Sequence, residues 1–377
     1  MTFELAESIL GIEAAGWDDL TGGHPALSHA FLAALERHGC VGEVAGWWPR
    51  YLLGRRAGAL VAAAPLFLKT HSYGEYVFDW AWADAYQRNG IEYYPKWLVA
   101  APFSPLPGPR LLGRDTSCRR AALAALLQIA QQSGLSSLHI LFATPEEREW
   151  MRTAGLLIRD GVQFHWQSRG ESDFDGFLSR LNHDKRKKIR QERRKVAALG
   201  LHVRWLNGED ASEADWRFFA RCYEGTYRAH HSTPYLNEAF FRDFARQRPG
   251  AVRLLLAERD DTPVASAYFL VSNGTLYGRY WGCQEPLPGL HFELCYYEPI
   301  DYCIRQGLTR MEGGAQGEHK LSRGLEPVET GSGHWIADPR FRDAIDRHLD
   351  HEAAHMTEYR EHLANRSPFR RPDGVPK

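Results

Sequence analysis

The chain has 377 residues, of which 44% are hydrophobic and 25% are charged, and these proportions are typical of an ordinary globular protein. A formal net charge of −1 excludes a strong whole-protein field, so any attraction to nucleic acid or anionic membranes must come from a local patch. The length predicts two domains.

The cysteines and the apolar runs indicate the compartment. No two cysteines form a CxxC pair, and a chain of this length does not need disulfides, so we expect reduced thiols. The N-terminal segment lacks the basic and apolar regions of a secretory signal, and no apolar run is long enough to span a membrane. These patterns predict a cytoplasmic protein without a membrane span. The six cysteines are Cys40, Cys118, Cys222, Cys283, Cys295 and Cys303.

The first half of the chain is punctuated by glycine and proline. Pro25 opens a helix that Gly39 ends, and Thr144 to Glu147 form a capping box with proline at the first helical position. Runs of apolar and β-branched residues predict the strands. In chain order we expect strands at 51–53, 59–68 and 76–82, a helix from about 118 to 134, a strand at 138–142, a helix after 144 and a strand at 162–166.

A basic segment from Phe177 to Leu199 separates the halves, and its thin apolar stripe predicts one linker helix. One interpretation is a cradle for a polyanion, whose affinity would fall steeply with salt. The alternative is a solvated linker whose charges only keep it in water. The candidate polyanion-binding residues are Lys185, Arg186, Lys188, Arg190 and Arg193.

The second half predicts a strand at 201–206, helices at 215–227 and 237–246, a meander at 252–257, 264–271 and 275–281, a helix around 292–304 and a strand at 309–312. Two short patterns recur between the halves. Residues 132–135 resemble residues 305–308, and residues 92–95 resemble residues 296–299. The recurrence predicts a duplicated α/β unit with a mixed, mostly antiparallel sheet covered by helices.

The stretch from Gly278 to Arg323 carries the candidate active site. Its glycine-rich loops allow tight backbone bends, and carboxylates, imidazoles and amines crowd around them. We expect Glu293 to act as a base or amine anchor, although an acid near a helix start can also simply complement the helix dipole. Ordinary surface charge is the alternative for Lys320 and Arg323. The candidate catalytic residues are Glu293, His291, Glu318, His319 and Lys320; the candidate substrate-binding residues are Arg279, Tyr280, Trp281, Tyr296, Gln316, Arg323, His231 and Tyr235.

These segments resemble a known family. Arg186 to Lys195 is similar to the basic helix of the FemABX-like peptidyltransferases, and the segments 290–293 and 314–320 resemble the FemAB-like, predicted N-acyltransferase branch of the GNAT superfamily. The resemblance implies an α/β (α+β) fold with tandem GNAT-like domains. We expect a first domain at 1–170, a basic linker helix at 171–200, a second domain carrying the site at 201–366, and a disordered tail at 367–377.

The resemblance also implies transfer of an acyl or aminoacyl group to an amine, such as a peptidoglycan-precursor-like or amino-acid-like acceptor, with no tightly bound cofactor. The donor is an acyl-CoA or an aminoacyl-tRNA. Residues 284–290 depart from the pyrophosphate loop of acyl-CoA-using relatives, because they contain one glycine and two prolines, which donate no N–H. This departure favours aminoacyl-tRNA, so tRNA is an expected partner. A non-catalytic module that recognises a cell-wall precursor or RNA is the alternative.

One further motif predicts different chemistry. His351 to His355 matches the HExxH pattern of zinc hydrolases, in which two histidines share a helix face. The expected helix is the last in the chain and is charged on most sides, and the third ligand position holds Glu361 rather than histidine. We therefore expect no metal there. The sequence selects neither the donor nor the acceptor, and it does not indicate an oligomeric state.

Overall fold

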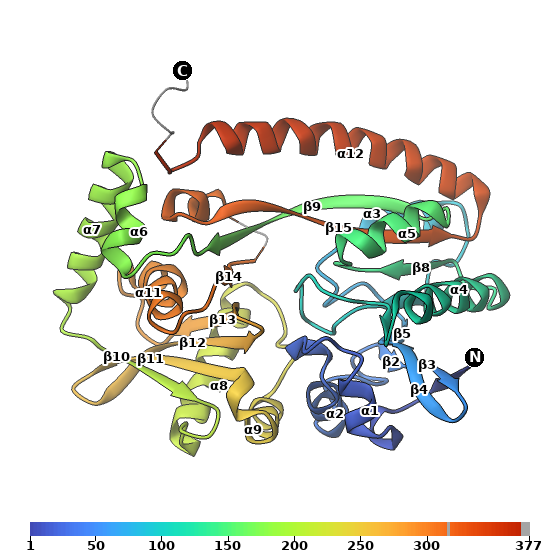
Figure 1. Ribbon diagram of the computed structural model, residues 1–377, viewed down its shortest axis with the longest axis horizontal. Coiled ribbons are helices and arrows are strands. Elements are labelled where there is room, and N and C mark those ends of the chain that lie inside the picture. Colours follow the sequence, from blue (N-terminus) through green and yellow to red (C-terminus); the bar gives the residue numbers. More distant parts are fainter. Residues whose placement is uncertain (315–316, 371–377) are drawn as a thin grey trace. The chain divides into compact units, whose positions relative to one another are not determined.

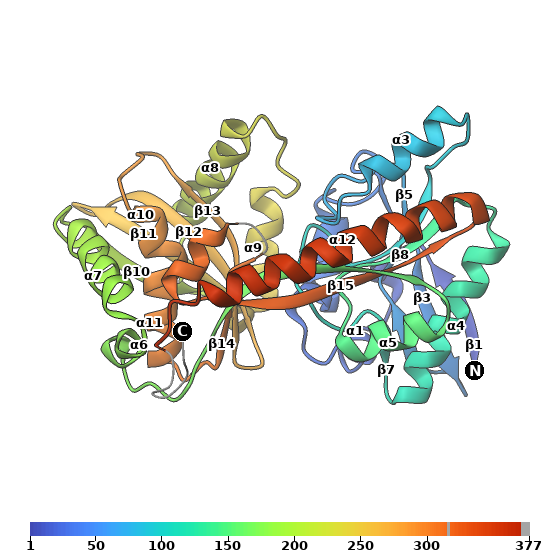
Figure 2. The same cartoon turned by 90° about the horizontal axis from the view of Figure 1, so that it is seen from above.

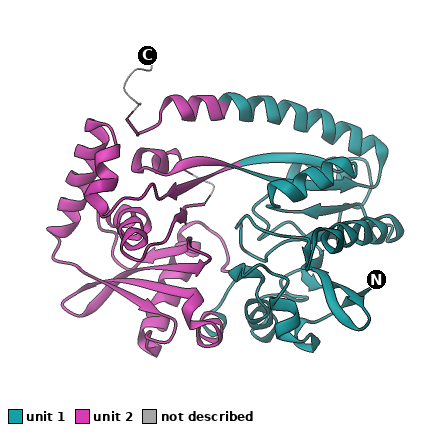
Figure 3. Cartoon of the chain, viewed as in Figure 1, with its two compact units in different colours: residues 1–161, 235–240, 329–358 teal, residues 162–234, 241–328, 359–377 magenta. Residues whose placement is uncertain are grey.

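A computed structural model describes residues 1–314 and 317–370. The chain forms two compact units, and each unit combines segments that lie far apart in the sequence (Figure 3). Unit 1 contains residues 1–161, 235–240 and 329–358. Unit 2 contains residues 162–234, 241–328 and 359–377. The domains expected from the sequence were consecutive, whereas unit 1 here includes a segment from near the C-terminal end.

Unit 1 contains two groups of strands (Figure 1). One group has the antiparallel order β1-β3-β4-β7, and the other has the order β15-β8-β6-β5-β2, in which β6 and β8 form a parallel pair. The elements are β1 (Thr2–Ala6), η1 (Ile9–Gly11), α1 (Ala14–Asp18), η2 (Pro25–Leu27), α2 (His29–Arg37), β2 (Trp47–Pro49), β3 (Tyr51–Arg56), β4 (Ala59–Ala64), β5 (Leu66–Lys69), α3 (Trp80–Arg88), β6 (Lys96–Val99), β7 (Leu112–Gly113), α4 (Thr116–Gln132), β8 (Ser137–Ile140) and α5 (Pro145–Thr153).

Three long elements contribute to both units: β9 (Leu157–Gln167), β15 (Glu326–Ile336) and α12 (Pro339–Asn365). The remaining elements lie in unit 2, apart from the start of α9. They are α6 (Phe174–Arg180), α7 (His183–Ala197), β10 (His202–Asn207), α8 (Glu213–Ala229), α9 (Glu238–Gln247), η3 (Pro249–Ala251), β11 (Val252–Arg259), β12 (Thr262–Ser272), β13 (Thr275–Cys283), α10 (Leu290–Phe292), the π-helical turn η4 (Glu293–Tyr297), α11 (Glu298–Arg305), β14 (Arg310–Glu312) and η5 (Glu318–Arg323).

The strands of unit 2 follow the order β10-β11-β12-β13-β14-β9, in which only β13 and β14 pair in parallel among the described residues. Helices cover both faces of this sheet (Figures 1 and 2). Tyr268 of β12 packs against Phe219 of α8 and Phe241 of α9. The next residue, Phe269, lies on the opposite face and packs with Trp205.

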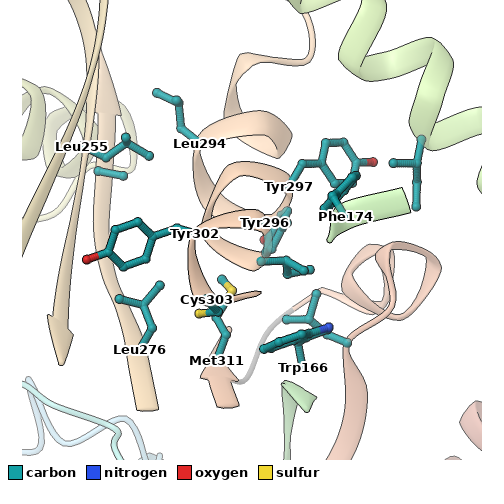
Figure 4. Packing of buried hydrophobic residues seen from close by; sticks show 14 of the residues in the cluster. Trp166, Phe174, Leu255, Leu276, Leu294, Tyr296, Tyr297, Tyr302, Cys303 and Met311 are labelled. Carbon is teal, nitrogen blue, oxygen red and sulfur yellow. The ribbon is translucent and has the colours of Figure 1, made fainter. Parts of the chain in front are cut away.

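The main core of unit 2 forms on the face covered by α11. Leu276 and Met311, which are partners in the β13–β14 pair, are fully buried beside Cys303 of α11 (Figure 4). Apolar burial of this kind contributes roughly 1.5–3 kcal/mol for each large side chain. Leu276 and Met311 therefore anchor the paired ends of β13 and β14 to α11. Their neighbours Tyr277 and Glu312 lie on the other face of the sheet, because side chains alternate along a strand.

Unit 1 contains a buried charged cluster. Lys96 is fully buried and donates to Glu75 at 2.9 Å and to Asp79, which are also buried. A charge removed from water is tolerated only when it is paired and hydrogen-bonded. The two carboxylates therefore compensate the lysine, and Ser72 accepts a third hydrogen bond from it at 2.9 Å.

A chain of hydrogen bonds extends this cluster to two buried histidines. Tyr93 donates to Asp79 at 2.6 Å and lies 3.0 Å from Nε2 of His139. Nδ1 of His139 lies 2.7 Å from Nδ1 of His334. Burial lowers the pKa of His334 to about 3 and lowers the pKa of His139 well below its ordinary value. Both imidazoles are therefore neutral near pH 7.

Several elements differ from the sequence expectations. The strand expected at 59–68 is two strands, β4 and β5, which belong to different strand groups. The strand predicted at 76–82 is wrong: Tyr76 has a φ of 63°, which interrupts extended backbone, and α3 begins at Trp80. The linker expected as one helix is two helices, because the side chain of Asn182 caps α7 by accepting from the N–H of Lys185 at 3.0 Å. In the segment expected as a tail, Phe369 forms a β-bridge with Leu181, and residues 371–377 lie outside the described residues.

The fold class expected from the sequence is confirmed. Each unit has a mixed, mostly antiparallel set of strands with helices. Each also has one parallel pair, β6–β8 in unit 1 and β13–β14 in unit 2. Across residues 1–314 and 317–370, no helix combines the length and the apolar character needed to cross a membrane.

Candidate functional site

The candidate site begins where two parallel strands part. β13 and β14 pair only over residues 275–277 and 310–312, after which β13 continues to Cys283 whereas β14 ends at Glu312. Gly313, Gly314 and Gly317 follow, and η5 then starts at Glu318. Gly314 and Gly317 have φ values of 78° and 98°, which favour glycine over any other residue. These two glycines therefore allow sharp backbone turns beside the parting strands.

Glu312 is a buried carboxylate at this point, and sequence reasoning missed it. It is 2% exposed, and Arg310 lies 3.4 Å from its Oε1. Its Oε2 has no hydrogen-bond partner among the described residues. Burial raises the pKa of Glu312 to about 7, against the opposing charges of Arg310 and Arg279. A carboxylate with such a pKa can take up and release a proton near neutral pH.

His165 lies opposite Glu312 in the pairing of β9 with β14. The imidazole is buried, and its Nε2 lies 3.2 Å from Oε1 of Gln163. Burial, together with the charges of Arg310 and Lys320, lowers the pKa of His165 to about 3. This histidine is therefore a neutral neighbour of the carboxylate rather than a competing cation. Sequence reasoning also missed it, because it lies almost 150 residues before Glu312.

Lys320 is buried at the start of the segment that follows the glycine loop, as expected for a functional rather than a surface lysine. Burial lowers the pKa of Lys320 to about 8, and Cys295 opposes this shift. No hydrogen bond or ion pair of its Nζ is found within residues 1–314 and 317–370. Its charge lowers the pKa of His165, His291 and His319, so the lysine lies close to all three imidazoles.

The candidate residues His291, Tyr296 and His319 lie together. The Tyr296 hydroxyl lies 3.1 Å from Nε2 of His319, and the ring centres of His291 and Tyr296 are 5.6 Å apart. Burial, with the nearby charges of His319, Arg323 and Lys320, lowers the pKa of His291 to about 4. The imidazole of His291 is therefore neutral near pH 7, so one ring nitrogen can donate a hydrogen bond and the other can accept one.

Glu293 points to a different face of the same helix. Its Oε1 accepts from Nε of Arg193 at 2.9 Å, and Arg193 also approaches Glu298 at 3.4 Å. Burial raises the pKa of Glu293, and the arginine opposes that shift. Glu293, Arg190 and Arg193 line a cleft of about 850 Å³ beside α6 and α7. The structure thus separates Glu293 from His319 and Lys320, with which sequence analysis had grouped it.

Arg323, expected to bind substrate, links three elements of unit 2. Its guanidinium lies 3.4 Å from the ring centre of Phe292, donates to the carbonyl of His319 at 2.8 Å and reaches Glu192 of α7 at 3.2 Å. Tyr297 donates to the same glutamate. Arg323 is only 4% exposed. These contacts position η5, which carries Lys320, against the helix that carries His291.

The other candidate residues lie apart from this group. Glu318 is exposed and pairs with Arg366 at 2.7 Å, so it does not join its neighbours His319 and Lys320. His231 is exposed at the end of α8. Tyr235 belongs to unit 1, where it stacks on Phe103 with ring centres 5.0 Å apart. Gln316 lies outside the described residues.

The expected substrate platform on β13 is half-buried. Arg279 donates to the hydroxyl of Tyr280 at 3.1 Å, and the ring of Tyr280 packs against Tyr223 of α8. Trp281 faces the helix that follows, where its ring centre is 5.2 Å from that of His291. Of these three residues, Trp281 is the one that contacts the histidine group.

The cations of α7 divide into two sets. Lys185 donates to Ser322 at 3.2 Å, Arg190 pairs with Asp175 at 2.8 Å, Arg193 pairs with Glu293, and Lys188 lies 3.9 Å from Glu192. Arg186, Lys187, Arg194 and Lys195 make no ion pair within the described ranges. Part of the expected polyanion site therefore binds acids of unit 2, and a smaller basic surface remains.

In the HExxH segment the glutamate is already engaged in an ion pair. Within α12, His351 and His355 are exposed, and Glu352 pairs with Arg159 at 2.7 Å. No group of three or more metal-ligating side chains is found in the described residues. The geometry thus gives Glu352 an ion-pairing role.

The sequence profile of the FemAB-like family, described as one of peptidoglycan biosynthesis and recognition, matches residues 8–371. No curated protein matches at the significance required.

Several solved structures share the fold. L-PGS from Bacillus licheniformis has a TM-score of 0.57 and 12% identity, covering 98% of this chain and 100% of its own. FemX has a TM-score of 0.54 and 12% identity, covering 92% and 100%. The C-terminal domain of a putative lysylphosphatidylglycerol synthetase from Agrobacterium fabrum has a TM-score of 0.55 and 11% identity, covering 89% and 96%.

Proposed function

Because this chain belongs to the FemAB-like family of peptidoglycan biosynthesis and recognition, we propose that it transfers an acyl or aminoacyl group from an activated donor to an amine. One observation carries the proposal. A buried carboxylate with a pKa of about 7, Glu312, and a buried lysine with a pKa of about 8, Lys320, lie where the parallel strands β13 and β14 part. The carboxylate can accept the proton of an acyl transfer, and the ammonium can stabilise the negative charge that develops.

In the proposed reaction the amine nitrogen attacks the carbonyl carbon of an ester or thioester. A new C–N bond forms, the C–O or C–S bond of the donor breaks, and the amine loses a proton. The Glu312 carboxylate takes this proton, which finally reaches the oxygen or sulfur of the leaving group. The Lys320 ammonium stabilises the negative charge that develops on the carbonyl oxygen. Positioning of the reactants can contribute roughly 7–11 kcal/mol when the geometry is good.

His291, Tyr296 and His319 act in this proposal as positioning residues around the acyl group. Their imidazole and phenol groups offer hydrogen bonds without adding a full charge, because burial keeps the pKa of His291 near 4. The Tyr296–His319 contact of 3.1 Å links the helix after β13 to η5. Glu293, which faces Arg193 instead, has no part in the transfer step.

Two features support aminoacyl-tRNA over acyl-CoA as the donor. The loop before α10 contains Pro286 and Pro288, which cannot donate the backbone N–H groups that hold pyrophosphate. Lys187, Arg194 and Lys195 are exposed on α7 and can contact phosphates. The proposed acceptor is the amine of a peptidoglycan-precursor-like peptide or of an amino acid, which agrees with the family description.

The test is a transfer assay with the purified full-length chain. Radiolabelled aminoacyl-tRNA and acetyl-CoA are each supplied with amine acceptors, and the labelled amide is quantified. We expect amide formation from at least one donor and its loss in Lys320→Met. Binding of a donor or an acceptor without transfer would refute the proposal and favour a recognition module.

A further inference from the structure

The cleft beside α6 and α7 combines an apolar wall with acidic groups. It measures about 850 Å³, large enough for a small organic molecule. Phe174, Leu178, Val196, Leu201 and Val203 supply the wall, and Figure 4 shows Phe174 beside Tyr297 of the helix that carries Glu293. All of the lining residues belong to unit 2. A ligand that fills this cleft therefore needs an apolar portion.

The lining of the cleft contains more carboxylates than guanidinium groups. Five carboxylates face three guanidinium groups, and the arginines are largely engaged already. Arg190 pairs with Asp175 at 2.8 Å, and Arg193 is shared by Glu293, Glu298 and Asp301. Arg305 also approaches Glu298 at 2.7 Å and Asp301 at 3.9 Å, so these three carboxylates share two guanidinium groups and one negative charge is in excess. A cation is thus better suited to this end of the cleft than an anion.

Glu293 is the most specific indication of a ligand. Its side chain is 8% exposed, and Arg193 reaches only its Oε1. Oε2 is buried and has no hydrogen-bond partner among the described residues. An unpaired buried carboxylate oxygen is costly, because it has lost water without gaining a donor. The contacts of Arg193 explain how α7 is held to η4 and α11, but they leave this oxygen unsatisfied.

From the apolar wall, the excess of carboxylates and the unpaired Oε2, we propose that this cleft is a second binding site of the chain, which takes a primary ammonium group attached to an apolar chain. The ammonium donates to Glu293, and the apolar chain lies against Phe174, Leu201 and Val203. This site is separate from the proposed transfer reaction, because Glu293 contacts Arg193 of α7 whereas Lys320 lies near His291 and His319. Its failure would leave the transfer proposal untouched.

The test uses n-hexylammonium as the probe and isothermal titration calorimetry on the full-length protein at low salt. We expect saturable binding that is at least about tenfold tighter than that of n-hexanol, since hydrogen bonds to charged groups are the stronger ones. Glu293→Gln keeps an acceptor for Arg193 but removes the charge, and it should weaken hexylammonium binding at least about tenfold. Glu318→Gln, which removes a carboxylate outside the cleft, should bind as the wild type does.

A second pair of variants keeps the test valid if Glu293→Gln unfolds. Ala197 is exposed and lines the cleft, whereas Ala198 is exposed and does not line it. Ala197→Trp should fill the cleft and abolish binding, and Ala198→Trp should not change it. Equal affinity for hexylammonium and hexanol, no saturable binding to the wild type, or equal binding to both tryptophan variants would overturn the proposal.

Discussion

Glu312 and Lys320 make the proposed reaction depend on pH in a defined way. Glu312 must be ionised to accept a proton, so activity should rise as the pH increases through about 7. Lys320 must be protonated to stabilise the oxyanion, so activity should fall as the pH increases through about 8. We expect a bell-shaped profile of kcat/KM with a narrow maximum between these values. Lys320→Arg should retain the acidic limb and lose the alkaline limb, and a profile unchanged in this variant would contradict the assignment.

Removing the Glu312 carboxylate should slow the transfer without unfolding the chain. Glu312→Gln has the same shape, and it should lower kcat by about 10²- to 10⁴-fold, the usual contribution of a general base. Glu318→Gln is the matched control, because Glu318 is exposed and pairs with Arg366 away from the site. Both variants should melt close to the wild-type temperature. A Glu312→Gln enzyme of wild-type rate would remove this residue from the mechanism.

Part of the candidate site could be predicted from the sequence. Glycines next to histidine and lysine indicated that His319 and Lys320 serve a site, and the structure places them beside His291 and Tyr296. Glu312 escaped notice because a glutamate at a strand end is usually exposed. Its burial depends on its place in the sheet, where β9 pairs with β14, and no local pattern reveals this.

Two adjacent arginines of helix α7 differ in their ion pairs, so their substitution should change the stability of the chain by different amounts. Arg193 compensates the buried Glu293, so Arg193→Met should destabilise the chain by about 2 kcal/mol, less than the roughly 3–5 of a fully buried pair, because its side chain is 27% exposed. Arg194 is exposed and pairs with no acid in the described part of the chain. Arg194→Met should therefore change stability by no more than about 0.5 kcal/mol.

Denaturant unfolding measures both values. Equal destabilisation by the two substitutions would show that the Arg193 ion pair contributes nothing beyond ordinary surface charge. Smaller effects of both variants in high salt would likewise indicate exposed charges, since buried pairs are screened much less.

Helices and strands with strong periodicity were predictable, whereas their irregularities were not. The meander of β11, β12 and β13 and the helix α8 follow the expected spacing. The π-helical turn at Glu293–Tyr297 was not expected, because Phe292, Tyr296 and Ile300 also fit an ordinary helix. Its extra residue helps to turn Glu293 and Tyr296 to different faces, which is why the expected catalytic group divides in two.

At the scale of the whole molecule, the buried histidines of unit 1 should govern acid stability. His334 has a folded pKa of about 3, below its ordinary value, so below pH 6.5 the unfolded chain binds a proton that the folded chain does not. Stability from this residue is present above pH 6.5 and declines as the pH falls toward 3, by about 1.4 kcal/mol per pH unit. Glu75, with a pKa raised to about 7, acts in the opposite direction between pH 4.5 and 7.

Comparing the wild type with His334→Gln isolates the contribution of His334 to the pH dependence of the unfolding free energy. His334→Gln removes this titration and leaves Glu75 in place, so its unfolding free energy should fall less steeply than that of the wild type between pH 6 and pH 4. Denaturant unfolding at several pH values measures the two slopes. Parallel slopes would show that His334 is protonated in the folded state.

Of the two short sequence patterns that recur between the halves of the chain, one marks equivalent positions in the two units and the other does not. Residues 132–135 and 305–308 precede β8 and β14, the second strands of the two parallel pairs, so this repeat marks equivalent positions. Residues 92–95 precede β6, whereas residues 296–299 lie in a helix, so this resemblance is fortuitous. The domain borders expected from the sequence were consecutive and did not include residues 329–358 in the first domain. A pattern of helices and strands does not reveal which distant strand will pair with β8, and here that strand is β15.

That late segment has a consequence for how the protein is made. β8 pairs with Gly333–Ile336 of β15, so unit 1 is incomplete until the ribosome has synthesised these residues, which follow most of unit 2. While unit 2 is being translated, the edge of β8 in residues 1–161 therefore stays unpaired. The order of synthesis and the order of folding therefore differ for unit 1. Residues 1–161 are synthesised before residues 333–336, but their sheet is complete only after those residues have been added.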